Sequence, residues 1–147
     1  MCDYSLHLLR SRPAKVGDKL TVSYFGIPHG TRGFAAPEDK NVAVCLLPGT
    51  ELSFANEVRR ESMWMPWGTK IIKYKTAIFR QINKEWLGTH HDALEFPDGQ
   101  IAPLNWLKPG QQATVLQLPA SAGVSHEPGA AVSRRARLPG QVPAISR

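Results

Sequence analysis

Val16–Val22 reads VGDKLTV, a glycine turn followed by a stretch in which apolar and polar residues alternate. The same pattern recurs at Pro48–Phe54 (PGTELSF) and at Pro109–Val115 (PGQQATV). In each copy we expect the glycine to take a positive φ, and the alternation that follows places one set of side chains on the inner face of a sheet. The copies are too unevenly spaced for a solenoid repeat, which favours a compact barrel or sandwich whose strands start at tight turns.

Other stretches of the body also have the apolar patterns of strands. Only Phe54–Met63 has the pattern of a short helix, and a single helical turn is expected at Trp106–Leu107. The sequence therefore predicts a mainly β fold, a small barrel or sandwich with at most one or two short helices. The predicted strands are residues 20–24, 42–47, 71–82, 94–96 and 113–118.

The chain of 147 residues is long enough for one domain with a modest core. After Pro119 the strand patterns end, and residues 120–147 consist largely of Ala, Gly, Pro, Ser and Arg without an aromatic residue. Such a segment buries too little apolar surface to offset the entropy lost on ordering. We therefore expect a single β-rich domain at residues 1–119 and a disordered basic tail at residues 120–147.

The composition also indicates the cellular compartment of the protein and the kinds of partner that it has. No apolar run is long enough to span a bilayer, and the start of the chain has no secretory signal. Two cysteines without an export signal are expected to be reduced thiols, because cytosolic proteins rarely hold disulfides. These observations predict a cytoplasmic protein without a membrane partner, which binds a protein or a small molecule.

Cys2 is the candidate catalytic residue. Removal of the initiator methionine would leave its thiol beside a free amine, and that amine is a possible base for a nucleophile. A cysteine at the head of a strand is the arrangement of N-terminal-cysteine hydrolases and amidotransferases. Here the signature consists only of Met-Cys, and Asp3 follows where small residues often stand. An inert, ordered N-terminus is the competing interpretation.

A zinc ion is the candidate cofactor, held by Cys2 with His90 or His91. Asp92 follows the two histidines, and a carboxylate near a histidine can orient or charge its ring. Adjacent histidines on a strand face opposite ways, so at most one of the two joins a given site. None of the strong zinc spacings occurs, and Cys45 lies in an apolar run typical of a buried thiol.

A basic and aromatic stretch from Arg59 to Trp86 is the candidate nucleic-acid surface. It has seven basic and two acidic residues, interleaved with tryptophan, tyrosine and phenylalanine. Aromatic rings that stack on bases, beside cations that meet phosphates, form a platform for single strands. The competing interpretation is a half-buried strand with a solvated lysine face and with the tryptophans in the core. The candidate binding residues are Lys70, Lys73, Lys75, Arg80 and Lys84.

Several stretches of the body resemble an uncharacterised family of small proteins from rhizobia-like soil bacteria. The similarity runs from Met1 to about Pro119, and so matches the predicted domain. The resemblance implies a bacterial, cytosolic protein and assigns no catalytic or binding residue. It rests on Met1–His7, Ser11–Leu20, Thr31–Ala36, Val42–Glu51 and His90–Gln100.

Three hypotheses about function follow from the sequence. The leading one is a non-enzymatic binding or accessory domain. The second is an enzyme or metal protein that uses Cys2 with His90 or His91. The third is a weak binder of single-stranded nucleic acid through the stretch from Lys70 to Lys84.

Overall fold

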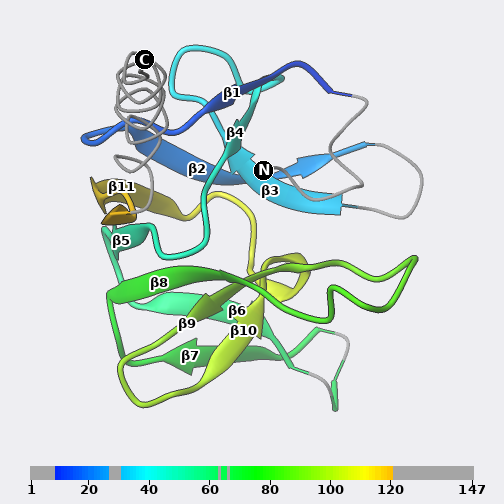
Figure 1. The fold of residues 1–147 in the computed structure, drawn as a ribbon. Coiled ribbons are helices and arrows are strands. Elements are labelled where there is room, and N and C mark those ends of the chain that lie inside the picture. The colour runs from blue at the N-terminus through cyan, green and yellow to red at the C-terminus, as the bar shows by residue number, and fades with distance from the viewer. Residues whose placement is uncertain (1–8, 27–30, 63, 66, 121–147) are drawn as a thin grey trace, which may run out of the picture.

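The computed structural model describes residues 9–26, 31–62, 64–65 and 67–120 (Figure 1). Within this part the chain forms eleven strands and one turn of 3-10 helix, η2. The prediction of a mainly β fold is therefore confirmed. The elements are β1 (Ser11–Pro13), β2 (Lys19–Phe25), β3 (Thr31–Ala35), β4 (Ala43–Cys45), β5 (Glu51–Phe54), β6 (Val58–Glu61), β7 (Thr69–Ile72), β8 (Thr76–Gln81), β9 (Asp92–Glu95), β10 (Ile101–Pro103), η2 (Leu104–Trp106) and β11 (Gln112–Gln117).

Nine of the strands form one sheet in the order β1-β4-β3-β2-β11-β5-β8-β9-β10. Its strands pair antiparallel except β1 and β4, which are parallel. The sheet is not closed into a barrel, because β1 and β10 remain its two edges. The other two strands, β6 and β7, form a separate hairpin, which Figure 1 shows at the lower side of the molecule. No helix in the described part is long and apolar enough to cross a membrane.

The core forms where the alternating strands turn their apolar side chains inward. On β2, for example, Leu20 and Val22 are buried while Lys19 at its start is exposed. The three repeated turns also have the expected geometry, with φ of +90° at Gly17, +99° at Gly49 and +89° at Gly110. The largest fully buried side chains are Phe34, Phe79, Leu20, Leu46, Leu52, Ile72, Leu94 and Leu107.

The prediction of a helix over Phe54–Met63 is wrong. Phe54 ends β5, and Val58–Glu61 is the strand β6, which pairs in register with β7. Val58 is fully buried opposite Ile72, so pairing with the next strand along the chain decides the local structure. The single helical turn predicted at Trp106–Leu107 occurs as η2, which begins at Leu104 and ends at Trp106.

The stretch from Ile71 to Ile82 is two strands rather than one. The chain bends at residues 73–75, between β7 and β8. The two strands have different partners, because β7 pairs with β6 in the hairpin whereas β8 lies between β5 and β9 in the large sheet. The apolar pattern continues across the bend, and so it hides the change of partner.

Arg32 on β3 fastens the hairpin to the large sheet. Its Nη1 donates to the carbonyl oxygens of Asn105 at 2.7 Å and Leu107 at 2.9 Å. Its Nη2 donates to Glu61 Oε1 on β6 at 2.7 Å. On the same side Arg60 lies over the ring of Trp106, with 5.7 Å between the guanidinium carbon and the ring centroid. These contacts fix how the hairpin is held against β3 and η2.

Candidate binding surface

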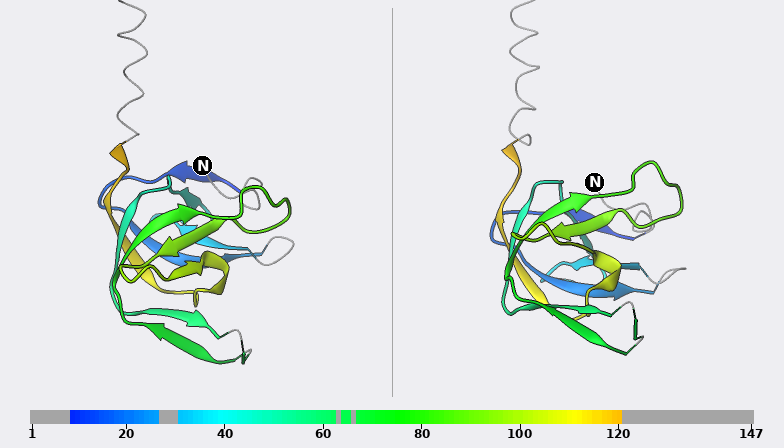
Figure 2. Two further views of the ribbon diagram at one scale, coloured as in Figure 1. Left: turned by 60° about the horizontal axis from the view of Figure 1, so that its bottom comes forward. Right: turned by 90° about the horizontal axis from the view of Figure 1, so that it is seen from below.

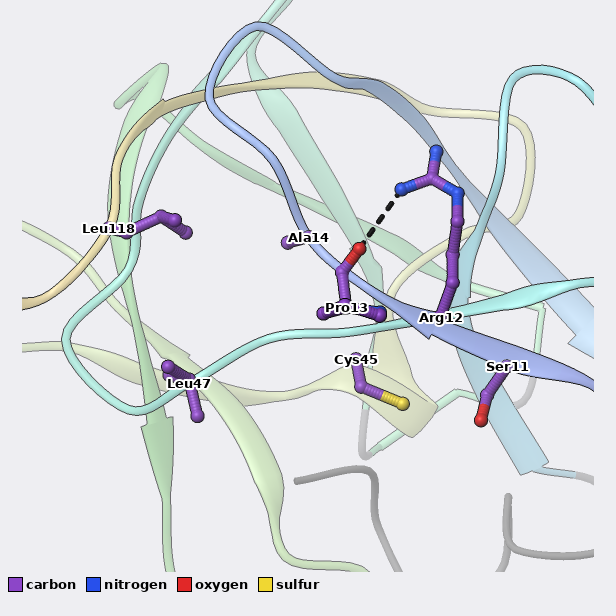
Figure 3. Close-up of a pocket in the computed structure, with 7 residues that line it drawn as sticks. All are labelled: Ser11, Arg12, Pro13, Ala14, Cys45, Leu47 and Leu118. Atoms are coloured by element: carbon purple, nitrogen blue, oxygen red, sulfur yellow. Dashed lines mark hydrogen bonds between the residues drawn. The ribbon is translucent and has the colours of Figure 1, made fainter. Parts of the chain in front are cut away.

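An apolar pocket of about 410 Å³ lies beside Cys45, where β1 runs parallel to β4 (Figure 3). Its wall is formed by Ser11–Ala14 together with Cys45, Leu47 and Leu118. The guanidinium of Arg12 does not supply a free charge to it, because that group is bonded to Asp18 and Glu38. Among the described residues, the wall of the pocket therefore offers mainly apolar contact.

Cys45 is disulfide-bonded, so the expectation of reduced thiols is wrong for this residue. Its place in the wall of the pocket also differs from the apolar interior predicted for it, since its side chain is only half-buried. The sequence has one other cysteine, Cys2, which lies outside the described residues. The catalytic and metal-binding hypotheses that depend on Cys2 therefore stay predictions.

His90 and His91 lie just before β9 and are half-buried. The Nδ1 atom of His91 is 3.0 Å from the carbonyl oxygen of Ile82, across the loop that joins β8 to β9. The next residue, Asp92, is buried, and its Oδ1 is 3.5 Å from Nε2 of Gln81. Among the described residues, no three His, Cys, Asp or Glu side chains come together in a group that could hold a metal ion.

The predicted nucleic-acid platform is not assembled on one strand face. Phe79, one of the aromatic residues of this stretch, is in the core. Lys73 and Lys75 lie in the bend between β7 and β8, and Arg80 on β8 is paired with Glu95 Oε2 at 2.5 Å. The two remaining cations, Lys70 on β7 and Lys84 after β8, are exposed.

A second pocket, of about 600 Å³, is polar and lies between the end of β5 and the start of β11. Arg59, Lys108 and Gln111 contribute to its wall. The side-chain amide of Gln111 is bonded to both backbone groups of Arg59, accepting from N at 2.6 Å and donating to O at 2.7 Å. Gln111 thus extends the pairing of β6, which is a structural use of its polar atoms.

The largest exposed apolar side chains lie on two loops, which we call the tryptophan loops. The first joins β6 to β7 and carries Trp64, Met65 and Trp67; the second joins β8 to β9 and carries Trp86 and Leu87. The exposed fraction is 93% for Trp64, 82% for Trp67, 65% for Trp86 and 98% for Leu87. The interpretation that placed these tryptophans in the core is therefore wrong.

Both loops project from the same side of the molecule, as all views in Figures 1 and 2 show. Backbone hydrogen bonds join described residues within each loop. In the first, Ser62 N donates to Gly68 O at 3.0 Å, and Gly68 N to Met65 O at 2.9 Å. In the second, Trp86 N donates to Asn83 O at 3.0 Å, and Thr89 Oγ1 to Trp86 O at 2.9 Å.

The sequence also indicates that the first loop is exposed, through its residue types rather than through its periodicity. Residues 62–69 (SMWMPWGT) have no charged residue, yet they contain a proline and a glycine that favour a turn. An apolar stretch at a turn is exposed, because turns lie at the surface.

No protein-family model, curated protein or solved structure matches this chain.

Proposed function

We propose that this chain is a non-enzymatic binding domain whose contact surface is formed by the tryptophan loops. The observation that carries the proposal is the exposure of Trp64, Trp67 and Leu87, each at least 82%, on two loops at the same side of the molecule. Large apolar side chains in water are unfavourable, and contiguous or clustered ones mark interaction sites. Tryptophan is also the residue most enriched among those that dominate binding energies.

The surroundings of the loops support binding rather than folding as their role. The described core is complete without them, since buried residues of β2, β5, β8, β9 and β11 pack together in one cluster. The turns that carry the loops are closed by their own hydrogen bonds. Replacing the exposed side chains therefore removes a contact surface and leaves the packing of the domain intact.

A photo-crosslinking amino acid placed at position 64 or 87 tests the proposal in the cells that make the protein. We expect adducts from both positions. Position 16 is the matched control, because Val16 is also an exposed apolar residue and lies in the β1–β2 connection on the opposite side of Figure 1. Failure to form adducts at positions 64 and 87, or equal adducts at position 16, would overturn the proposed surface.

A further inference from the structure

We propose that the tryptophan loops dock this domain on the surface of an anionic phospholipid bilayer. This inference rests on the proposed function and names its partner. The loops would insert their apolar tips at the level of the lipid headgroups, with the body of the domain outside the bilayer. It departs from the expectation of no membrane partner, which was drawn from the lack of an apolar run long enough to span a bilayer.

The shape of the loops favours a bilayer over a folded protein. Trp64 and Trp67 lie on one loop and Leu87 on the other, and each side chain is almost fully exposed rather than packed into a flat patch. A protein partner would need a pocket for each of them, whereas the fluid interface of a bilayer takes up separate side chains. Tryptophan prefers this interface, because its ring is apolar and its N–H meets water and headgroups.

Each loop has a lysine close to its apolar residues in the sequence. Lys70 follows Trp67 by three residues, and Lys84 precedes Trp86 by two; both lysines are exposed. The exposed Glu85 is the acidic neighbour in the second loop, while residues 62–69 of the first have no charge. A negatively charged surface attracts such lysines within the distance that salt does not screen.

A pair of like charges at the base of the first loop also favours an anionic partner. Arg60 and Lys70 are directly opposite each other on β6 and β7. Like charges at opposite positions of an antiparallel pair destabilise it. Headgroup phosphates beside Lys70 would relieve this repulsion. A second copy of the chain would instead increase the repulsion, because each copy has a net charge of +6.

Vesicles provide the direct test with the full chain. Co-sedimentation and tryptophan emission are measured with vesicles of phosphatidylcholine alone and with vesicles that also contain phosphatidylglycerol. We expect binding and a blue shift of the emission with the anionic vesicles, and weaker binding as salt is raised. The double variant Trp64→Ser, Trp67→Ser should bind at least about tenfold more weakly, because two large apolar side chains no longer leave water.

Two further variants separate the apolar and electrostatic parts. Lys70→Glu should weaken binding to anionic vesicles by about tenfold, since each cation near the surface contributes on the order of 1 kcal/mol and the reversal adds repulsion. The variant Val16→Ser should bind like the wild type, because Val16 is an exposed apolar residue outside the loops. Absence of wild-type binding, or full binding by the double tryptophan variant, would overturn the lipid assignment.

Failure of this inference can be told apart from failure of the proposed function. If vesicles are not bound while crosslinks from positions 64 and 87 capture a protein or a nucleic acid, the contact surface stands and its assignment to lipid is wrong. Binding of a single-stranded oligonucleotide that Trp64→Ser, Trp67→Ser abolishes, without vesicle binding, would assign the same surface to nucleic acid instead.

Discussion

Val22 and Val115 occupy equivalent positions in two interlocked copies of one backbone motif. Val22 exchanges two hydrogen bonds with the turn before β11, accepting from Gly110 N at 2.7 Å and donating to Gln111 O at 2.8 Å. Val115 makes the same pair of bonds with the turn before β2, accepting from Gly17 N at 2.8 Å and donating to Asp18 O at 2.9 Å. Each strand thus closes the turn that begins the other.

The third copy of the turn uses the same bonds with a different strand. Gly49 N donates to Phe79 O at 2.8 Å, and Phe79 N donates to Thr50 O at 2.8 Å. The strands that follow the three turns, β2, β11 and β5, are neighbours at the centre of the sheet. A short sequence pattern therefore marks the three strands that organise the fold.

Gly17→Ala should destabilise the domain by about 1–2 kcal/mol, because an L-residue is strained at a φ of +90°. An added Cβ at this position meets no atom within 4 Å, so the cost comes from the backbone alone. Denaturant unfolding followed by circular dichroism measures it. Gly26→Ala is the matched control, because Gly26 is equally open and is not among the positive-φ glycines. Equal losses in the two variants would contradict this account of the turn.

The features that the sequence predicted are those decided by neighbouring residues. The glycine turns and the alternation of β2 and β11 are local, and both were predicted correctly. The hairpin was missed because Val58 packs opposite Ile72 on the next strand, which the apolar spacing within one segment does not show. Its attachment through Arg32 was missed because Asn105 lies 73 residues further along the chain. The exposure of Trp64 was missed because the strand patterns say nothing about turns, although the proline and glycine of residues 62–69 indicate one.

Asp18→Asn should cost about 1–2 kcal/mol at neutral pH, because Asp18 Oδ2 accepts from Arg12 Nη1 at 2.8 Å and from Lys15 N at 2.9 Å. The hydrogen bond from Arg12 is the main cause that lowers the pKa of Asp18 in the folded protein. A carboxyl with a lowered folded pKa stabilises above its unfolded pKa, about 3.9, and loses this stabilisation as pH falls through the folded value.

The stability difference between wild type and Asp18→Asn is therefore expected to be full near neutral pH and to shrink below about pH 4. Urea unfolding over a pH series measures it. Asp39→Asn is the comparison, because Asp39 is paired with Arg10, a far more exposed arginine, and should show a smaller effect. If the stability difference between wild type and Asp18→Asn stayed the same from neutral to acidic pH, the charge of Asp18 would not be its cause.

Arg32→Lys should destabilise the domain by about 2 kcal/mol and loosen the β6–β7 hairpin first. Lysine has one ammonium group and cannot reproduce the bonds from the two guanidinium nitrogens to Glu61, Asn105 and Leu107. Relative to the wild type, the variant should show a larger increase in hydrogen exchange in β6 and β7 than in β2 and β11. Arg10→Lys, at an exposed arginine, should leave the exchange pattern unchanged. Uniform acceleration across all strands would argue against a fastening role.

Deletion of residues 120–147 should leave the thermal midpoint within a few degrees of that of the full chain. The composition of this segment provides neither large apolar clusters nor aromatic side chains for a core. Differential scanning calorimetry of the two chains makes the comparison. A large fall in the midpoint would place the domain boundary beyond Pro119.

The protein purified without reductant should have no free thiol and should be a monomer linked between Cys2 and Cys45. Cys45 is disulfide-bonded, and Cys2 is the one other cysteine in the sequence. Intact mass and peptide mapping under non-reducing conditions identify the bond.

Reduction should destabilise the domain by about 3–4 kcal/mol, because the bond closes a loop of roughly 40 residues in the unfolded chain. Cys45→Ser should show the same loss without reductant. A dimer joined through Cys45, or two titratable thiols, would contradict the intramolecular bond. Cys2 would then have a free thiol, as the catalytic and zinc hypotheses require, since only a free thiolate serves either role.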